Sequence, residues 1–387
     1  MQQFYVYASS WTHGRGEGGI SLFHMDKDSG ALTFVEKYCA GTDFNVTLYE
    51  PKRALLYALN TASDLPGLRG GGGGRLFVFR VDAATGALEQ IDCKPLWSTN
   101  PAQLSLDAEG RYLIVANHGT RSTVTKIKKD AFGRYYPCVE RDDATVELFA
   151  LEENGCVGEL LDVVYHVGSG PEWRQASAHP HSCEMAPDGR FFVVCDKGCD
   201  TVTLYTVDRE HHKIQRFGDV AEHAPATLPR YVKFHPSLPC FYHNNEACMD
   251  LHTFRYSDTG RLELIATCST LPQGELAEKK EGEVYEQQCL VMHPNGRFLY
   301  DVARGPNCIA VFALDPASGI PHCIQHVYTQ GHWPRGLSIS PDGRFMLLCN
   351  VKSNEIEVYR VGEDGRLTPT QHKATAECAA YATFWTP

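Results

Sequence analysis

The stretch that decides the fold begins with Pro187-Asp188-Gly189-Arg190-Phe191, continues through an apolar segment to Cys195-Asp196, and ends with Thr201-Val202-Thr203-Leu204-Tyr205. It reads as a tight turn, a buried strand, a polar connection and a second strand. Dipeptides of the Asp-Gly type favour hairpin turns, because glycine adopts positive φ without steric cost. The stretch therefore predicts one unit of antiparallel β-structure.

The same pattern returns along the chain. Close copies begin with Pro294-Asn295-Gly296-Arg297-Phe298 and with Pro341-Asp342-Gly343-Arg344-Phe345, and a looser copy begins at Asp107. Three weaker copies begin at Phe4, at Pro51 and at His235-Pro236. A period of about 40–50 residues with several short strands per unit is typical of a β-propeller. Seven units predict an all-β, seven-bladed β-propeller.

The two ends of the sequence are expected to complete one blade together. The first unit starts part-way through a blade, and residues 379–385 form a further candidate strand. Pairing of this C-terminal strand with the N-terminal blade would close the ring and remove the free sheet edges that promote aggregation. We therefore expect residues 1–387 to form a single domain, although the length alone favours two or three.

Composition limits the partners and the compartment. The hydrophobic content is 43% and the formal net charge is −11, which argues against nucleic acid or an anionic membrane surface as a partner. No stretch approaches the ~20 apolar residues of a transmembrane helix, and the first residues lack the features of a signal peptide. The fifteen cysteines are scattered and form no Cys-x-x-Cys pair. We expect them to be reduced, in a cytoplasmic protein.

Two insertions break the regular spacing of the units. Residues 119–144 are polar and rich in lysine, and residues 269–286 are acidic. Loops on a rigid scaffold often carry function, so we expect both to lie over one face of the disc. The alternative is that they are surface loops without a role.

Candidate site residues lie just ahead of the repeated turns, where a propeller presents side chains to its central channel. The richest stretch contains His179 and His181, which should point to the same side of an extended segment. The corresponding stretches of other units carry Arg230 and Arg335. The strands that follow supply the remaining candidates, which are Asp196, Asn245, Glu246 and Arg304.

Each of these residues also has a purely structural interpretation. The His179/His181 pair could bind a metal, but no third ligand stands at a diagnostic spacing, so no metal is expected there. A single arginine could simply hydrogen-bond carbonyl groups at the ends of strands. Three arginines, two histidines and a glutamate at corresponding positions instead predict a basic axial pocket. Such a pocket suits a carboxylate or phosphate, because guanidinium groups grip these anions in a bidentate manner.

At these residues the sequence resembles the seven-bladed lactonases. This family includes bacterial 6-phosphogluconolactonases of the propeller type and fungal carboxy-cis,cis-muconate cyclase. The resemblance covers essentially the whole chain. Its most specific pieces are His179-Pro180-His181-Ser182, Asp196-Lys197-Gly198-Cys199-Asp200, Pro229-Arg230, Asn245-Glu246, Arg304-Gly305, Pro334-Arg335-Gly336 with Asn350, and Ala116-Asn117-His118-Gly119.

The resemblance implies a metal-independent and cofactor-free site in the channel. Carried over by motif, the catalytic residues are His181, His179, Glu246 and Arg230, and the substrate-binding residues are Arg304, Arg335, Asn245 and Asp196. The sequence departs from the family pattern at two places. Cys289 stands where the family often has an acidic residue, and Val302-Ala303 stands where it often has Ser-Asn.

The expected function is hydrolysis of a phosphorylated or carboxylated sugar lactone, by default 6-phosphogluconolactone to 6-phosphogluconate. His181 or Glu246 would activate water while the arginines bind the anion. One alternative is the reverse chemistry, lactonisation of an unsaturated dicarboxylic acid of the muconate type. Another is a non-enzymatic propeller that binds a partner, because a fold does not determine a function.

Overall fold

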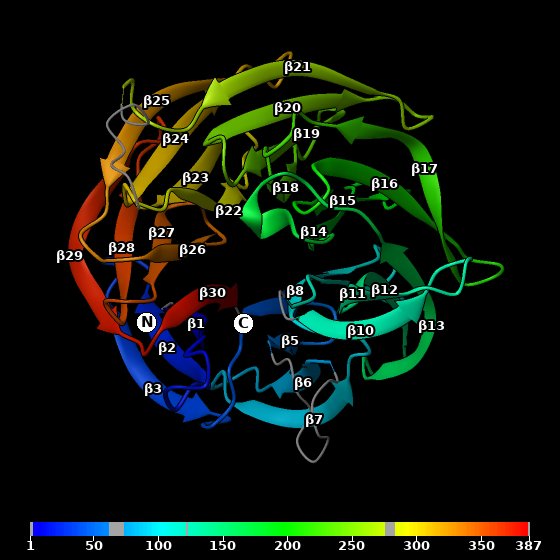
Figure 1. Ribbon diagram of the computed structural model, residues 1–387. Coiled ribbons are helices and arrows are strands. Elements are labelled where there is room, and N and C mark those ends of the chain that lie inside the picture. The colour runs from blue at the N-terminus through cyan, green and yellow to red at the C-terminus, as the bar shows by residue number, and fades with distance from the viewer. Residues whose placement is uncertain (1–2, 62–72, 121–122, 275–282, 386–387) are drawn as a thin grey trace.

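The computed structural model describes residues 3–61, 73–120, 123–274 and 283–385. Seven four-stranded antiparallel sheets are arranged in a ring, as Figure 1 shows, and one two-stranded hairpin stands beside them. The sequence prediction of a seven-bladed β-propeller is confirmed. A single 3-10 turn, η1 (Trp173–Gln175), is the only helical element in these residues.

The seven blades follow the chain, each with its innermost strand at the axis. From the axis outward, the first blade contains β30 (Ala379–Trp385), β1 (Gln3–Ser10), β2 (Ile20–Asp26) and β3 (Leu32–Tyr38), the second contains β4 (Val46–Glu50), β5 (Leu55–Asn60), β6 (Arg75–Val81) and β7 (Leu88–Pro95), and the third contains β8 (Pro101–Leu106), β9 (Tyr112–Asn117), β12 (Ala144–Leu151) and β13 (Val157–His166). The fourth blade contains β14 (Pro180–Met185), β15 (Phe192–Asp196), β16 (Thr201–Asp208) and β17 (Lys213–Glu222), and the fifth contains β18 (Pro229–Phe234), β19 (Cys240–Asn245), β20 (Asp250–Tyr256) and β21 (Leu262–Ser269). The sixth blade contains β22 (Glu286–Met292), β23 (Phe298–Arg304), β24 (Cys308–Leu314) and β25 (Pro321–Tyr328), and the seventh contains β26 (Pro334–Ile339), β27 (Phe345–Asn350), β28 (Glu355–Val361) and β29 (Leu367–Thr375).

The ring is closed by the last strand, as the sequence predicts. β30 pairs with β1 in antiparallel register, with Tyr5 opposite Trp385. It becomes the innermost strand of the first blade, whose other strands all come from the N-terminal end of the chain. The Thr383 hydroxyl also lies 2.7 Å from the Thr47 hydroxyl on β4, so the closing strand is tied to the second blade as well.

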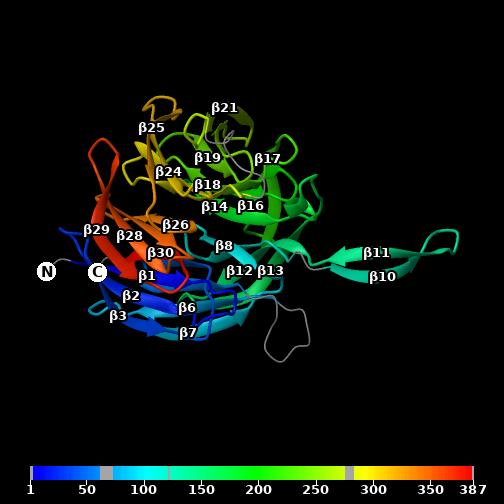
Figure 2. The same cartoon turned by 60° about the vertical axis from the view of Figure 1, so that its left-hand side comes forward.

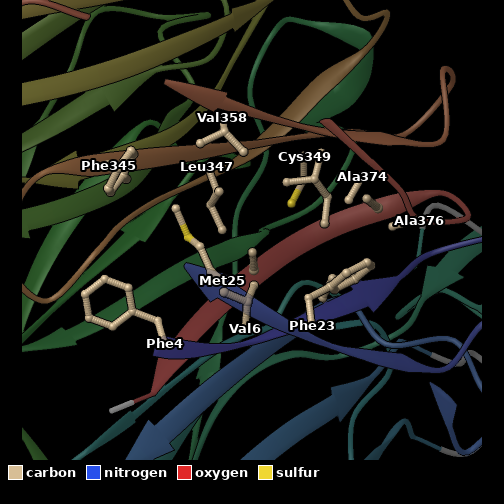
Figure 3. Packing of buried hydrophobic residues seen from close by; sticks show 14 residues of the cluster. Phe4, Val6, Phe23, Met25, Phe345, Leu347, Cys349, Val358, Ala374 and Ala376 are labelled. Atoms are coloured by element: carbon tan, nitrogen blue, oxygen red, sulfur yellow. The ribbon is translucent and has the colours of Figure 1, made fainter. Parts of the chain in front are cut away.

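The core consists of apolar layers between adjacent blades. Figure 3 shows the layer where the last blade meets the first. Phe345, Leu347 and Cys349 of β27 face Val6 of β1 and Met25 of β2, and all five side chains are buried. Because the two joined blades come from opposite ends of the chain, this layer holds the closed ring together through burial of apolar surface.

Tyrosines add a polar link between neighbouring blades. The hydroxyl groups of Tyr7, Tyr57, Tyr242 and Tyr300 each donate to the carbonyl of a glycine in an outer turn of the next blade, at 2.7–2.9 Å. The glycine that accepts from Tyr7 is Gly86, with φ of 75°, and a Cβ on it would lie 2.5 Å from the ring of Tyr5. The repeated Gly of the turn therefore serves blade packing as well as the turn itself.

The insertion at residues 119–144 is not an irregular loop. It forms the hairpin of β10 (Thr123–Lys129) and β11 (Tyr135–Arg141). The hairpin rises from one face of the ring, beside the third blade (Figures 1 and 2). Of the second insertion, residues 275–282 lie outside the described residues.

Within the described ranges, no helix is long and apolar enough to cross a membrane. All fifteen cysteines are free thiols.

Candidate active site

A cavity of about 1100 Å³ opens at the axis, and every blade contributes residues to its wall. The wall is made by the beginnings of the innermost strands and by the connections that follow the second strands. Its polar side chains include His118, His181, Lys197, Glu246 and Glu286, together with Arg230, Arg304 and Arg335. Three tryptophans, Trp11, Trp173 and Trp333, add flat apolar faces to this wall.

A repeated irregularity aims side chains at the cavity. In four blades a proline begins the innermost strand, and the pairing register slips directly after it, at Ala102, His181, Arg230 and Arg335. A β-bulge leaves a residue unpaired and redirects its side chain, which here points into the channel. The residues before three of these prolines, Asn100, Leu228 and Trp333, have φ of 56°, 57° and 66°. The X-Pro-Arg motif is thus a structural device that presents an arginine at the axis.

His181 is a buried, neutral imidazole. Burial lowers the pKa of His181 well below its ordinary value, and the charges of Arg230 and Lys197 lower it further. Its ring lies 5.4 Å from the ring of Tyr231 and 5.8 Å from that of His118. A neutral histidine on the wall of a polar cavity can accept a proton from a water or a substrate hydroxyl.

Glu246 lies at the centre of an ion-pair network. Its carboxylate accepts hydrogen bonds from Lys197 Nζ at 2.9 and 3.0 Å and from Arg174 Nη1 at 3.2 Å, and Arg230 Nε is 2.8 Å away. Burial alone would raise the pKa of Glu246. The three cations outweigh burial and lower the pKa to about 2. Glu246 is therefore a permanent anion and a poor proton acceptor at neutral pH.

The network extends through a second carboxylate to Arg304. Glu286 accepts from Arg174 Nη1 at 3.1 Å and from Arg304 Nη1 at 2.9 Å. Arg304 also donates to the Gln288 side chain at 2.8 Å, and its guanidinium lies 4.4 Å from the ring centre of Trp333. Burial is the main reason that the pKa of Arg304 falls to about 10, so the group stays charged at neutral pH.

Arg335 stands apart from the carboxylates. It donates to the Asn45 side chain and stacks over Trp11, with 3.8 Å from the guanidinium carbon to the ring centre. Burial lowers the pKa of Arg335 to about 9, with further contributions from the charges of Arg230 and Arg304. Within the described residues, no ion pair neutralises its positive charge. A bound anion would therefore find an excess of positive charge in this part of the cavity.

Three predicted site residues do not line the cavity. Asp196 is completely buried and accepts from His166 and from the backbone N–H groups of His179 and Gly198 at 2.8–2.9 Å. His179 stacks on His118 at 4.1 Å, and its Nδ1 lies 2.7 Å from the His118 carbonyl oxygen. Asn245 donates to Asp250 at 2.6 Å. These residues lie behind the cavity wall. Of the His179/His181 pair, only His181 lines the cavity among the described residues, although the rings of both histidines approach that of His118.

The departures from the family pattern also lie outside the cavity. Cys289 is buried in the layer between two blades, and its thiol donates to the carbonyl of Leu337. Burial raises the pKa of Cys289 to about 11, so it is a protonated, packing residue. The carboxylate on this strand is instead supplied by Glu286. Val302 and Ala303 are likewise buried in apolar clusters.

Several lining residues were not singled out from the sequence. The polar ones include Lys197, Glu286 and Gln288, and the aromatic ones include Trp11 and Trp173. The repeat contained a signal for Lys197. Lys197 directly follows Asp196 at the end of β15, and Glu246 directly follows Asn245 at the end of β19, so the two residues occupy corresponding positions in two blades. Both line the cavity. Arg174 reaches the network from η1, where Glu172 and Gln175 form a capping box, and no repeat marks this turn.

A seven-bladed propeller with a buried imidazole and a surplus of arginines in its axial cavity has the features of an anion-binding enzyme of this fold. The family model described as "Lactonase, 7-bladed beta-propeller" matches residues 5–384. The chain therefore belongs to this lactonase family, and the resemblance noted in the sequence is confirmed.

Similar proteins support this assignment. The 6-phosphogluconolactonase of Bacillus subtilis is 25% identical over 372 residues, which cover 95% of this chain and 94% of that protein. The 6-phosphogluconolactonase of Formosa agariphila is 24% identical over 360 residues, with 92% of each chain covered. Among solved structures, the periplasmic gluconolactonase PpgL of Pseudomonas aeruginosa has a TM-score of 0.83 at 24% identity and covers both chains fully. This structural similarity establishes the shared fold.

Proposed function

We propose that the protein hydrolyses a sugar lactone that carries an anionic group, with 6-phosphogluconolactone as the first substrate to test. The observation that carries this proposal is the neutral imidazole of His181 beside the cations Arg230 and Lys197. The names of the relatives in Bacillus subtilis and Formosa agariphila support it. They favour hydrolysis over lactonisation of a dicarboxylic acid and over a purely binding role.

In the proposed mechanism, His181 is the general base. It removes a proton from a water molecule, whose oxygen attacks the lactone carbonyl carbon. The negative charge that develops on the carbonyl oxygen is stabilised by Arg230 or Lys197. When the ring C–O bond breaks, the leaving oxygen takes the proton back from His181, and the product is a hydroxy acid. Glu246 acts as a fixed anion that orients the two cations, because its pKa of about 2 leaves it unable to hold a proton at neutral pH.

The remaining arginines provide substrate binding. Arg304 and Arg335 offer guanidinium groups on the cavity wall, and both are backed by a tryptophan ring. A phosphate is well suited to this pair, because planar guanidinium groups bind phosphate oxygens in a bidentate manner. His179, Asp196 and Asn245 act as positioning residues in this proposal.

We also propose that residues 1–387 form one domain in the cytoplasm. The pairing of β30 with β1 supports the first part, since both ends of the described chain belong to one blade. The fifteen free thiols support the second, because disulfides form in oxidising compartments.

The test is hydrolysis of 6-phosphogluconolactone in metal-chelating buffer, coupled to 6-phosphogluconate dehydrogenase. The wild-type protein should exceed the spontaneous rate, and His181→Ala should lose about 10²–10⁴-fold in kcat, the usual contribution of a general base. The matched control is His211→Ala, which removes an exposed histidine that lies in the turn between β16 and β17 and pairs with Asp208. A wild-type rate equal to the spontaneous rate, or an unchanged rate in His181→Ala, would overturn the proposal.

A further inference from the structure

We propose that His223, His243 and His252 form a binding site for a transition-metal ion, zinc in the first instance, between the fourth and fifth blades. Among the described residues, this is the one group of three or more histidine, cysteine or carboxylate side chains whose ligand atoms converge. None of the three belongs to the wall of the axial cavity. The site is therefore separate from the proposed active site.

The three imidazoles come together from two blades. His243 of β19 and His252 of β20 stand directly opposite each other in the strand pairing. His223 follows the last residue of β17, so it reaches them from the neighbouring blade. The ring centres are 4.8–5.1 Å apart, and one ligand nitrogen from each ring lies within 4.8 Å of the others. Zinc–nitrogen bonds of about 2.0–2.1 Å would need only small side-chain rotations from this arrangement.

Two ring nitrogens of the cluster are buried and have no hydrogen-bond partner within the described part of the chain. They are Nε2 of His223 and Nδ1 of His252. The ring of His243 is completely buried and stacks on Phe254, and it lies within reach of the Asn244 backbone and the Asn245 side chain. A buried polar atom without a partner costs about 1–3 kcal/mol. A metal ion bound by all three imidazoles would satisfy both unpartnered nitrogens.

A carboxylate supports one of the proposed ligands. Asp250 Oδ2 lies 3.7 Å from Nε2 of His252, on the ring edge opposite the unpartnered Nδ1. Asp250 is itself held by Asn245 Nδ2 at 2.6 Å. A carboxylate beside the second ring nitrogen is the usual arrangement around a metal-bound histidine, because it fixes the tautomer and raises the basicity of the ligand.

The donor set decides which metal ion fits the site. Imidazole ligands suit Zn²⁺, Cu²⁺ and Ni²⁺ rather than Mg²⁺ or Ca²⁺, which prefer oxygen.

A metal ion here would brace the segments that carry two site residues. His223 begins the connection that leads to Arg230. His243 lies on β19, and Glu246 directly follows the last residue of that strand. The backbone already joins these segments, because Glu246 N–H donates to the carbonyl of Leu228 at 2.8 Å. We therefore infer a structural role for the ion, which stabilises the junction of the two blades.

The experiment is titration of the chelator-stripped full chain with Co²⁺ and then Zn²⁺. Cobalt bound by imidazoles gives visible d–d bands, whereas thiolate ligation adds intense near-ultraviolet charge-transfer bands that would reveal binding by cysteines instead. We expect one equivalent of Co²⁺ without thiolate bands, displacement by Zn²⁺, and a Zn²⁺-dependent rise in Tm, because a ligand that binds only the folded state stabilises it.

Variants locate the site. His223→Gln and His252→Gln change half-buried positions, and each should abolish one-to-one binding and the rise in Tm. Asp250→Asn should weaken binding by about 10- to 100-fold. The control His211→Gln, at an exposed position, should behave as wild type. Any one of three results would overturn the proposal. The wild-type protein could fail to bind one equivalent of metal, thiolate bands could appear, or binding could survive both His223→Gln and His252→Gln.

Discussion

Lys197 Nζ lies 2.9 and 3.0 Å from the two carboxylate oxygens of Glu246, and both side chains are almost entirely removed from solvent. This pair is the first link of a chain of alternating charges that runs on through Arg174 and Glu286 to Arg304. Each carboxylate neutralises more than one cation, so the loss of one member leaves several buried charges uncompensated.

Glu246→Gln should therefore destabilise the fold strongly. Three buried cations would lose their shared anion, and breaking a buried ion pair on one side costs about 3–5 kcal/mol. The free energy of unfolding in urea measures this. The control is Glu263→Gln, which removes an exposed partner of Arg255 and should cost about 1 kcal/mol or less. If both variants lost the same free energy of unfolding, the proposed stabilising role of the buried ion-pair network would be contradicted.

The pH profile should show no inflection near the ordinary pKa of histidine. The folded-state pKa of His181 is lowered by burial and then by Arg230, so the imidazole stays neutral as the pH falls through 6.5. We expect kcat/KM, corrected for spontaneous hydrolysis, to stay level from pH 7.5 to 6.0 and to fall only in more acidic solution. Arg230→Gln removes one cause of the lowered pKa and should move the acid limb to higher pH. A wild-type inflection at about pH 6.5 would rule out a buried, cation-flanked base.

Arg304→Ala should mainly impair substrate binding. A charge-assisted hydrogen bond to a phosphate contributes about 1.5–3 kcal/mol, so KM should rise roughly 10- to 100-fold with little change in kcat. Glu286 would keep its contact with Arg174, which limits the structural damage. Steady-state kinetics with the phosphorylated and unphosphorylated lactones measure the effect, and only the phosphorylated one should lose binding. Arg297→Ala, an exposed residue beside the same strand, should leave both constants unchanged.

Asp196→Ala should lower kcat by misplacing the segment that leads to His181. The carboxylate accepts from three backbone N–H groups, those of His179, Gly198 and Cys199. Displacement of a catalytic group by about 1 Å can cost 10²-fold, and leaving buried donors unpaired costs about 1–3 kcal/mol of stability. Asp196→Asn retains one acceptor oxygen and should recover most of the lost kcat. Failure of Asn to rescue would mean that the charge itself takes part in the reaction.

The sequence predicts the fold well because each blade repeats the same turn and the same buried strand. The insertion at residues 119–144 is predicted poorly for the opposite reason. Strands β10 and β11 have no buried face: Ile127 is 76% exposed and Tyr135 is 71% exposed. A half-buried strand alternates apolar and polar residues because only one of its faces is buried. Both faces of this hairpin lie in solvent, so its sequence need not alternate in this way.

The site is predicted where it follows the repeat and missed where it does not. Arg230 and Arg335 occupy the same bulge in two blades, so the X-Pro-Arg motif finds them. Asp196 and Asn245 end their strands one residue short of the cavity, and the residues that follow, Lys197 and Glu246, line it. Glu286 reaches the network from the first position of β22, and Arg174 reaches it from η1. The direction of both side chains depends on tertiary packing, which no local pattern encodes.

The pairing of β30 with β1 has a consequence for biosynthesis. A ribosome makes β1 first, but the strand that completes its blade emerges only after residues 379–385 have been translated. Until then, β1 and the inner strand of the second blade both lack a neighbour, and the apolar layer of Figure 3 is open on one side. Nascent chains stalled before residue 379 should thus remain sensitive to protease at the first blade, and full-length chains should become resistant. The closing strand makes translation of residues 379–385 a condition for completion of the fold.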